Sequence, residues 1–161
     1  MQSLRIFLIL LSPLTLCAQS NEKAEIIAVV NQVFEAMRTN DSTMLKGAFI
    51  EIPSTYTVFR DKKGVTQFRA DDFQNFVNAV GKPKADVWNE PIWNEKIEID
   101  EALASVWVDY AFYLNDKFLH CGVDAFHLVK LDAEWKIFHL VDTRRRADCD
   151  VPKAVSAQFE K

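Results

Sequence analysis

Residues 102–131 read ALASVWVDYAFYLNDKFLHCGVDAFHLVKL, and this stretch decides the fold. Apolar and aromatic residues alternate with other residues on both sides of Asn115–Asp116, which is the period of a β-strand. A short polar pair between two such runs predicts a tight hairpin turn. A second turn at residues 132–134 leads into WKIFHLVDTR at 135–144. We therefore expect successive hairpins and an antiparallel sheet.

Two earlier stretches extend the predicted sheet. Ile92–Asp100 has the same period of two, and a turn at Asp100–Glu101 joins it to the stretch above. Thr55–Arg60 is rich in β-branched and aromatic residues, which favour strands. The Asp61–Gly64 segment after it has the composition of a turn.

The remaining elements before residue 86 are predicted helices. Apolar residues recur at helical spacing from Ile26 to Met37, after a favourable helix start at Asn21. Asp41 is expected to cap a short second helix, and Asp71 to cap a third that ends at Gly81. Helices followed by a run of hairpins indicate an α+β domain with the helices packed on one sheet face.

The composition fits one ordinary globular domain. The chain has 161 residues, of which 49% are hydrophobic and 26% are charged. A domain of this size buries about 70% of its unfolded surface, so it can fold without metal or disulfide crosslinks. With 19 basic and 23 acidic residues the net charge is −4, which argues against a nucleic-acid partner.

The N-terminal stretch 1–18 is predicted to be a signal peptide. Arg5 precedes an apolar run from Ile6 to Leu16, which is shorter than the roughly 20 residues that span a bilayer. Cleavage near Ala18 would give a periplasmic or secreted protein with no membrane span. The less favoured alternative is a lipoprotein anchored at Cys17, since the large Leu16 precedes that cysteine.

Two cysteines, Cys121 and Cys149, remain in the predicted mature chain. Exported proteins mature where disulfides persist, and Cys149 stands in a polar segment where a free thiol would be exposed. We therefore favour a Cys121–Cys149 disulfide. The alternative is two buried thiols that pack as small apolar groups.

Four motifs carry a resemblance to a known superfamily. They are VWVDYAF at 106–112, HCGVDAF at 120–126, WKI at 135–137 and DTRR at 142–145. Together with the order of elements, they are similar to exported bacterial members of the nuclear transport factor 2-like superfamily, often described as SnoaL-like or lumazine-binding. The resemblance covers residues 22–149 and implies a cone, in which a curved sheet wraps a long N-terminal helix around a pocket.

The resemblance divides the chain but leaves its function open. It implies a superfamily domain at residues 19–149, between the predicted signal peptide and a polar tail at 150–161. The superfamily includes isomerases, dehydratases and cyclases as well as binding and dimerisation modules, so the fold does not determine the function. No residue in the sequence specifically indicates a pterin-like ligand.

The turn at Asn115–Asp116 also predicts which side chains share a face of the sheet. If Leu114 faces Lys117, the cross-strand pairs are Ala111 with His120, Asp109 with Gly122, and Trp107 with Asp124. A one-residue shift would move a whole strand's side chains to the other face. The face with the chemically interesting side chains comprises Trp107, Asp109, Tyr113, His120, Asp124, Phe126, Trp135, His139 and Thr143. The candidate ligand-binding residues are Trp107, Tyr113, Phe126, His139 and Thr143.

The candidate catalytic residues on that face are His120, Asp109 and Asp124. An unperturbed histidine has a pKa near 6.5, so His120 can act as a general acid or base. Asp109 would orient its ring, Asp124 would serve the far side of a substrate, and Gly122 would leave open space between them. The alternative is that His120 and Asp109 form a purely structural pair.

No metal or cofactor is expected. His120 and Cys121 are neighbours on a strand and point to opposite faces, and no His-x-His or Cys-x-x-Cys spacing occurs. The sequence also lacks a Gly-x-Ser-x-Gly nucleophile motif and a glycine-rich phosphate loop.

Three functional hypotheses follow. The first is that the pocket binds a small apolar or amphipathic molecule. The second is a cofactor-independent lyase or isomerase that uses His120 with Asp109 or Asp124. The third is a non-catalytic homodimer, in which the face with Val106 and Val108 is buried between subunits.

The only basic run, Arg144–Arg146, is open to two interpretations. It is more readily explained as a solvated strand end than as a site for an anionic ligand.

Overall fold

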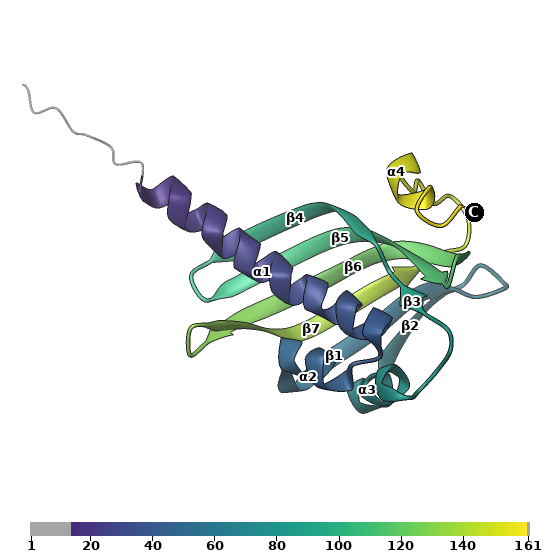
Figure 1. Ribbon diagram of the computed structural model, residues 1–161, viewed down its shortest axis with the longest axis horizontal. Coiled ribbons are helices and arrows are strands. Elements are labelled where there is room, and N and C mark those ends of the chain that lie inside the picture. The colour runs from purple at the N-terminus through teal and green to yellow at the C-terminus, as the bar shows by residue number, and fades with distance from the viewer. Residues whose placement is uncertain (1–13, 161) are drawn as a thin grey trace, which may run out of the picture.

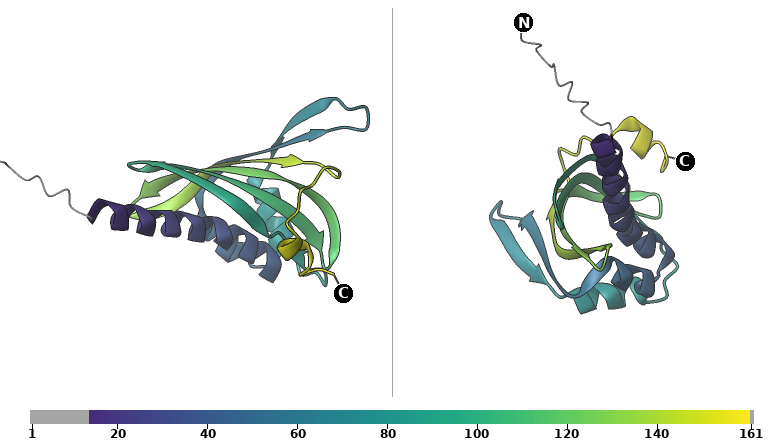
Figure 2. Two further views of the ribbon diagram at one scale, coloured as in Figure 1. Left: turned by 90° about the horizontal axis from the view of Figure 1, so that it is seen from above. Right: turned by 90° about the vertical axis from the view of Figure 1, so that its left-hand side faces the viewer.

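The computed structural model describes residues 14–160 and has the expected α+β fold. A strongly curved sheet wraps around the long N-terminal helix, and two short helices lie together at one end of it (Figures 1 and 2). The predicted signal peptide lies outside the described residues, except for positions 14–18 at the start of that helix.

Helix α1 (Leu14–Thr39) lies in the concave face of the sheet. Its buried stripe, as expected from the spacing, consists of Ile26, Val30, Val33, Ala36 and Met37. Asn21 is not a helix cap, because the helix begins upstream of it, and its side chain instead donates to Glu25 at 3.1 Å. The helix ends at Asn40, whose φ of 58° is left-handed. No helix within residues 14–160 is long and apolar enough to cross a membrane.

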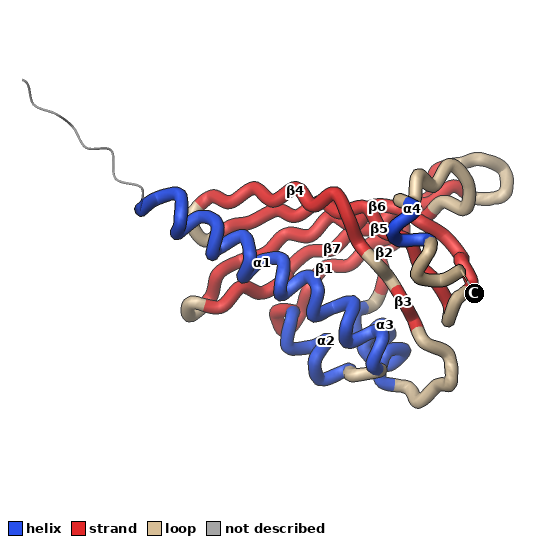
Figure 3. The backbone as a smooth tube through the Cα atoms, turned by 45° about the horizontal axis from the view of Figure 1, so that its top comes forward, coloured by secondary structure: helices blue, strands red, loops and turns tan. Residues whose placement is uncertain are grey.

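Two capped helices close one end of the cone (Figure 3). Asp41 caps α2 (Ser42–Ala48), as expected, by accepting from the backbone N–H groups of residues 43 and 44. The cap of α3 (Phe73–Gly81) is Asp72 and not Asp71. Asp71 is the last residue of a strand, and its carboxylate is held by Thr57 and an arginine.

The sheet has seven strands. Their bounds are β1 (Phe49–Arg60), β2 (Thr66–Asp71), β3 (Trp88–Asn89), β4 (Ile92–Asp100), β5 (Leu103–Leu114), β6 (Lys117–Leu131) and β7 (Glu134–Arg144). The order is β2-β1-β7-β6-β5-β3, and β4 also pairs with β5. All pairs are antiparallel except β1–β7, which is parallel. A short helix, α4 (Lys153–Ser156), follows the sheet.

The long hairpins match the sequence prediction, but two strands do not. Strand β2 was not expected, because its mostly exposed residues show no apolar alternation. It pairs with β1 across the predicted Asp61–Gly64 turn, where Gly64 has a φ of 78°. Strand β3 is only two residues long and equally lacks a sequence signal.

One extra residue in β6 overturns the predicted register. Leu114 faces Lys117 as expected, but the pairing then shifts by one residue at Leu119. The predicted pairs of Ala111 with His120, Asp109 with Gly122, and Trp107 with Asp124 are therefore wrong. Beyond this bulge, Phe112 faces His120, Tyr110 faces Gly122, Val108 faces Asp124 and Trp107 faces Ala125.

The shifted register exchanges the two faces of β5. Val106 and Val108 are fully buried in the core with α1, so they cannot form the subunit interface that we expected. Trp107 lies on the convex face, where 49% of its surface is exposed. A one-residue insertion has this effect because successive side chains of a strand point to opposite faces.

A second bulge affects β7. The turn lies at Asp132–Ala133, and the register shifts at Phe138, between Leu128 facing Ile137 and His127 facing His139. Trp135 is buried on the concave side, as predicted. His139 and Thr143 are on the opposite side from His120, contrary to expectation, because the bulge lies between them and Trp135.

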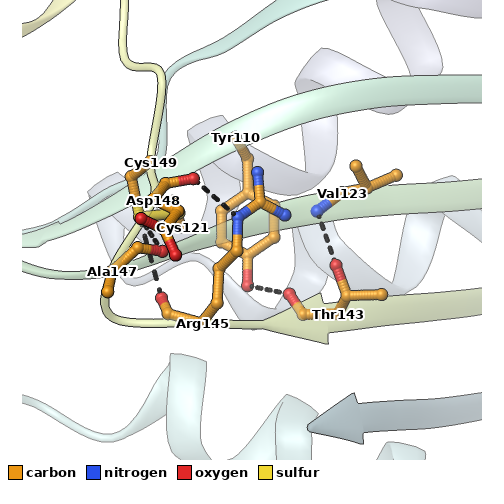
Figure 4. The surroundings of a disulfide bond; sticks show 8 residues. All are labelled: Tyr110, Cys121, Val123, Thr143, Arg145, Ala147, Asp148 and Cys149. Carbon is orange, nitrogen blue, oxygen red and sulfur yellow. Dashed lines mark hydrogen bonds between the residues drawn. A yellow bond between two sulfur atoms is a disulfide. The ribbon is translucent and has the colours of Figure 1, made fainter.

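The ladder between β6 and β7 is interrupted at Gly122. The Thr143 carbonyl turns out of the ladder and accepts from the Tyr110 hydroxyl at 2.9 Å, while Thr143 Oγ1 accepts from the Val123 N–H at 3.0 Å (Figure 4). A Cβ on Gly122 would stand 1.8 Å from the Thr143 carbonyl oxygen. Gly122 therefore allows close backbone approach and does not open free space, contrary to expectation.

The expected disulfide joins Cys121 in β6 to Cys149 beyond β7. Next to it, Cys121 and Arg145 exchange two backbone hydrogen bonds of 2.9 Å. The segment after β7 is thereby fixed against the centre of the sheet. Further on, the Phe159 ring stacks on Tyr113 at 3.9 Å.

Replacement of Gly122 by alanine is expected to destabilise the fold by about 3 kcal/mol, because the new methyl group overlaps backbone atoms that cannot move separately. Urea unfolding would measure the change. Gly47→Ala is the control, since a Cβ there meets only the flexible end of Gln32, at 3.2 Å. Equal stability of the two variants would contradict the close approach at Gly122.

Candidate functional site

A cavity of about 300 Å³ lies between the concave sheet face, α1 and α3. It has an apolar end and a polar end. The apolar side chains come from both helices and from the middle of β6 and β7, and are Val33, Phe34, Met37, Phe76, Phe126 and Leu140. Phe34 and Phe126 meet edge to face at 6.2 Å. This end can hold an apolar group.

Two arginine–carboxylate pairs border the polar end. Arg144 Nε donates to Asp142 at 2.6 Å, and Arg69 Nε donates to Asp71 at 2.9 Å. The Thr57 hydroxyl stands 2.5 Å from both carboxylates. Burial alone would raise the pKa of Asp71, but the hydrogen bonds from Thr57 and Arg69 outweigh it and hold the pKa below its usual value.

A second pair of acids, Glu90 and Asp124, has no arginine bound to it. Asp124 comes from the centre of β6 and is 3% exposed, and Glu90 comes from the segment between β3 and β4. The two carboxyl groups lie close enough for each to influence the pKa of the other. Among the described residues, no N–H or O–H donor reaches the buried Asp124 Oδ2.

Burial and mutual repulsion keep this acid pair protonated. Burial, with the nearby Asp142 carboxylate, raises the pKa of Glu90 to about 8. Burial and the adjacent Glu90 place the pKa of Asp124 well above its usual range. Two carboxylates this close cannot both ionise, so at neutral pH the pair can donate a proton as well as accept hydrogen bonds.

His120 lies where the cavity opens outward. Its ring packs on Tyr110 and Phe112, with centroids 5.8 and 5.1 Å apart. Burial, helped by the positive charge of Arg144, lowers the pKa of His120 to about 4. The imidazole is therefore neutral at neutral pH and can accept or donate one hydrogen bond.

Comparison with protein families identifies the group to which this chain is related. Residues 21–141 match a family described as putative lumazine-binding, which is most of the chain. The chain belongs to this family. Comparison with curated proteins finds no match.

Solved structures confirm the nuclear transport factor 2-like fold of this family member. A protein of unknown function from Shewanella baltica is 17% identical with a TM-score of 0.61, over 80% of this chain and 97% of that one. One of unknown function from Mycobacterium tuberculosis is 18% identical with a TM-score of 0.66, over 91% and 85%. A Streptomyces avermitilis protein described as a putative dehydratase is 8% identical with a TM-score of 0.62, over 80% and 99%. These identities establish the fold alone.

Three of the predicted site residues of this family member line the cavity together. They are His120, Asp124 and Phe126, all on β6. The strand was predicted correctly, and residues 120, 124 and 126 share one of its faces whatever the register.

The other predicted residues lie elsewhere. Asp109 is on the convex side, where its carboxylate accepts from Asn94 at 2.7 Å, so it cannot orient His120. Trp107 is exposed, Tyr113 packs on Phe159, and His139 packs on Tyr56 with centroids 5.6 Å apart. Thr143 uses its hydroxyl to complete the sheet ladder.

Sequence reasoning missed most of the polar end, including Glu90, Tyr110, Asp142 and Arg144. Tyr110, Asp142 and Arg144 were assigned to the opposite face by the register error. Glu90 had no periodic pattern around it, and its only signal was a carboxylate beside Pro91 in a segment rich in tryptophan. Within residues 14–160, no group of three potential ligands is arranged to hold a metal ion.

The acid pair is expected to make stability fall with rising pH. Between pH 6.5 and 8 the folded protein holds a proton that the unfolded chain has released, so the unfolding free energy should drop by about 2 kcal/mol. Below pH 6.5 the neutral His120 has the opposite effect, because the unfolded imidazole gains a proton there first. Urea unfolding at several pH values would measure how the unfolding free energy changes below and above pH 6.5.

In the double variant Glu90→Gln/Asp124→Asn, the unfolding free energy should no longer fall as the pH rises above 6.5. Asp109→Asn is the control, because it removes a carboxylate outside the cavity. A double variant that kept the full slope would show that other groups hold the proton.

Proposed function

We propose that the chain binds a small amphipathic molecule in the cavity. The observation that carries this proposal is the buried Asp124 Oδ2, which has no donor within residues 14–160 and belongs to a cavity whose other end is apolar. An unpaired buried oxygen costs about 1–3 kcal/mol, and a ligand that donates to it removes that cost. The membership of the family described as putative lumazine-binding also supports ligand binding.

The cavity restricts the size and chemistry of the ligand. A volume of about 300 Å³ is at the lower end of the range for small-molecule sites, so the ligand is compact. Its apolar part contacts Phe34, Met37 and Phe126, and its polar part faces Glu90 and Asp124. A neutral group with an N–H or O–H suits this acid pair better than a carboxylate, which the pair would repel.

We infer that the protein acts outside the cytoplasm. The Cys121–Cys149 disulfide supports this inference, since such bonds persist in oxidising compartments. The predicted signal peptide at residues 1–18 gives the same location from the sequence. Whether the protein is periplasmic or fully secreted, and whether it dimerises, stay predictions.

Filling the cavity should abolish binding while a matched substitution outside it should not. Leu140→Trp places an indole in the cavity, whereas Val141→Trp places it on the opposite face of the same strand. The fluorescent probe N-phenyl-1-naphthylamine should bind the wild type and Val141→Trp alike, and Leu140→Trp at least about tenfold more weakly.

The proposal would be wrong if folded Leu140→Trp bound the probe as tightly as the wild type did. Native mass spectrometry of protein purified without added ligand would complement the titration, because a retained small molecule gives the mass of the natural occupant. The mass of that occupant should disappear from the spectrum of Leu140→Trp.

A second candidate function is proton-transfer catalysis by a lyase or isomerase without a cofactor. Its support is that Glu90 has its pKa raised to about 8 and that His120, on the same cavity wall, is neutral at neutral pH. A group that titrates near neutral pH is suited to general acid–base catalysis. Asp124 is the carboxyl that can assist, since Asp109 lies outside the cavity.

Exchange of carbon-bound hydrogen tests this second candidate. In D₂O at pH 7, the wild type should accelerate deuterium uptake next to the carbonyl of 1-tetralone, as followed by NMR. Glu90→Gln/Asp124→Asn should lower that rate about 100-fold or more, the usual loss when a general acid–base group is removed. A wild-type rate equal to that of buffer would contradict catalysis of this kind while leaving binding intact.

A further inference from the structure

A second hollow lies beside the cavity and is strongly basic. It has a volume of about 1110 Å³ and separates the β1–β2 hairpin from the end of β7 and the segment after it. Its charged lining consists of Arg60, Lys62, Arg69, Arg144, Arg145 and Arg146, against the two acids Asp61 and Asp148. We call this hollow the basic groove. A chain with a net charge of −4 does not gather six cations in one place by composition alone.

Three cations of the basic groove form neither an ion pair nor a side-chain hydrogen bond with the described residues. Within residues 14–160, the side chains of Arg60, Lys62 and Arg146 take part in no ion pair. Asp61, which stands between Arg60 and Lys62 in the sequence, is occupied by the backbone N–H groups of its own turn and by Gln67. Their positive charge is therefore available to an incoming anion.

Two further arginines use only some of their hydrogen-bond donors. Arg69 and Arg144 each bind their carboxylate through Nε, and their terminal amino groups donate no hydrogen bond within the described residues. About half of each side chain is exposed, 55% and 46% respectively. A guanidinium presents five N–H donors, so each can hold an anion while it keeps its own carboxylate.

The walls of the basic groove are fixed in place. The disulfide and the backbone bonds between Cys121 and Arg145 hold the wall that follows β7 (Figure 4). Ladder pairing between β1 and β2 holds the opposite wall, where the Arg69 guanidinium lies 5.7 Å from the centre of the Phe59 ring. A preorganised cluster of cations loses less entropy on binding than flexible surface chains do.

The basic groove adjoins the cavity. Arg69, His120 and Arg144 line both hollows. The positive charges also reach the boundary, because Arg144 and Arg146 both help to hold the pKa of His120 low. A compact molecule can therefore extend from the apolar end, past the acid pair, to the cations.

We propose that the basic groove binds the anionic group of the molecule whose apolar body occupies the cavity. The ligand is then an amphipathic anion with a carboxylate, sulfate or phosphate group held by Arg69 and Arg144 and attracted by the unpaired cations. This inference rests on the proposed function and adds the charge class of its ligand.

Two probes that differ by one anionic group test the proposal. The neutral probe is N-phenyl-1-naphthylamine, and 8-anilino-1-naphthalenesulfonate has the same aromatic rings with an added sulfonate. The wild type should bind the sulfonate at least about tenfold more tightly, and added salt should reduce that preference. The variant Arg60→Gln/Lys62→Gln/Arg146→Gln should weaken the preference, because only Arg69 and Arg144 then remain to hold the sulfonate, and should still bind the neutral probe as before.

A charge-matched variant controls for net charge. Lys23→Gln/Lys82→Gln/Lys96→Gln removes three exposed cations that line neither hollow, and should keep the preference. Equal wild-type affinity for the two probes, or equal loss of preference in both triple variants, would overturn the anion proposal and leave cavity binding standing. If the wild type binds neither probe, the proposed function fails for this class of ligand.

In that last case inorganic phosphate tests the basic groove by itself. Calorimetry should detect phosphate binding to the wild type and the control variant, and weaker binding to the groove variant. No binding to the wild type, or equal binding to all three proteins, would overturn the proposal. Groove-dependent sedimentation with phosphatidylglycerol vesicles, without phosphate or sulfonate binding, would also overturn it, because the cations would then contact a membrane surface.

Discussion

One extra residue, Leu119 in β6, is the constraint on which the site depends. Without this bulge, the turn at Asn115–Asp116 would place Tyr110 and His120 on opposite faces of the sheet. With it, Tyr110, His120 and Asp124 share the concave face and meet α1. The bulge in β7 does the same for Leu140 and Asp142. Both bulges also bend the sheet, which is why it curves far enough around α1 to enclose a cavity.

Charge is distributed in steps from the inside of this cavity outward. The innermost acids, Asp124 and Glu90, have raised pKa values, because burial disfavours two ions there. The next acids, Asp142 and Asp71, each accept a hydrogen bond from an arginine. Beyond them lie cations without partners. The molecule thus changes from protonated acid, through ion pairs, to positive charge along one path, and a ligand that follows it must vary in polarity along its length.

The sequence was sufficient for most of the elements and insufficient for their register. The period of two, the Asn115–Asp116 turn, the Asp41 cap and the disulfide depend on local chemistry, so each could be predicted. A bulge depends on how two strands fit across many residues, and Leu119 has no local feature that marks it. The short strand β3 and the polar strand β2 form only because β5 and β1 are beside them. Glu90 and the opposing wall of the basic groove could not be predicted for the same reason.

The crosslink between Cys121 and Cys149 also decides how the molecule responds to force and to cutting. It attaches the last part of the chain to β6, which has β5 on one side and β7 on the other. A pull on the C-terminal end therefore acts on the middle of the sheet and cannot peel β7 away first. A protease that cuts the turn at Asp132–Ala133 leaves two pieces that stay covalently joined, so a nicked molecule remains a single particle wherever proteases are abundant.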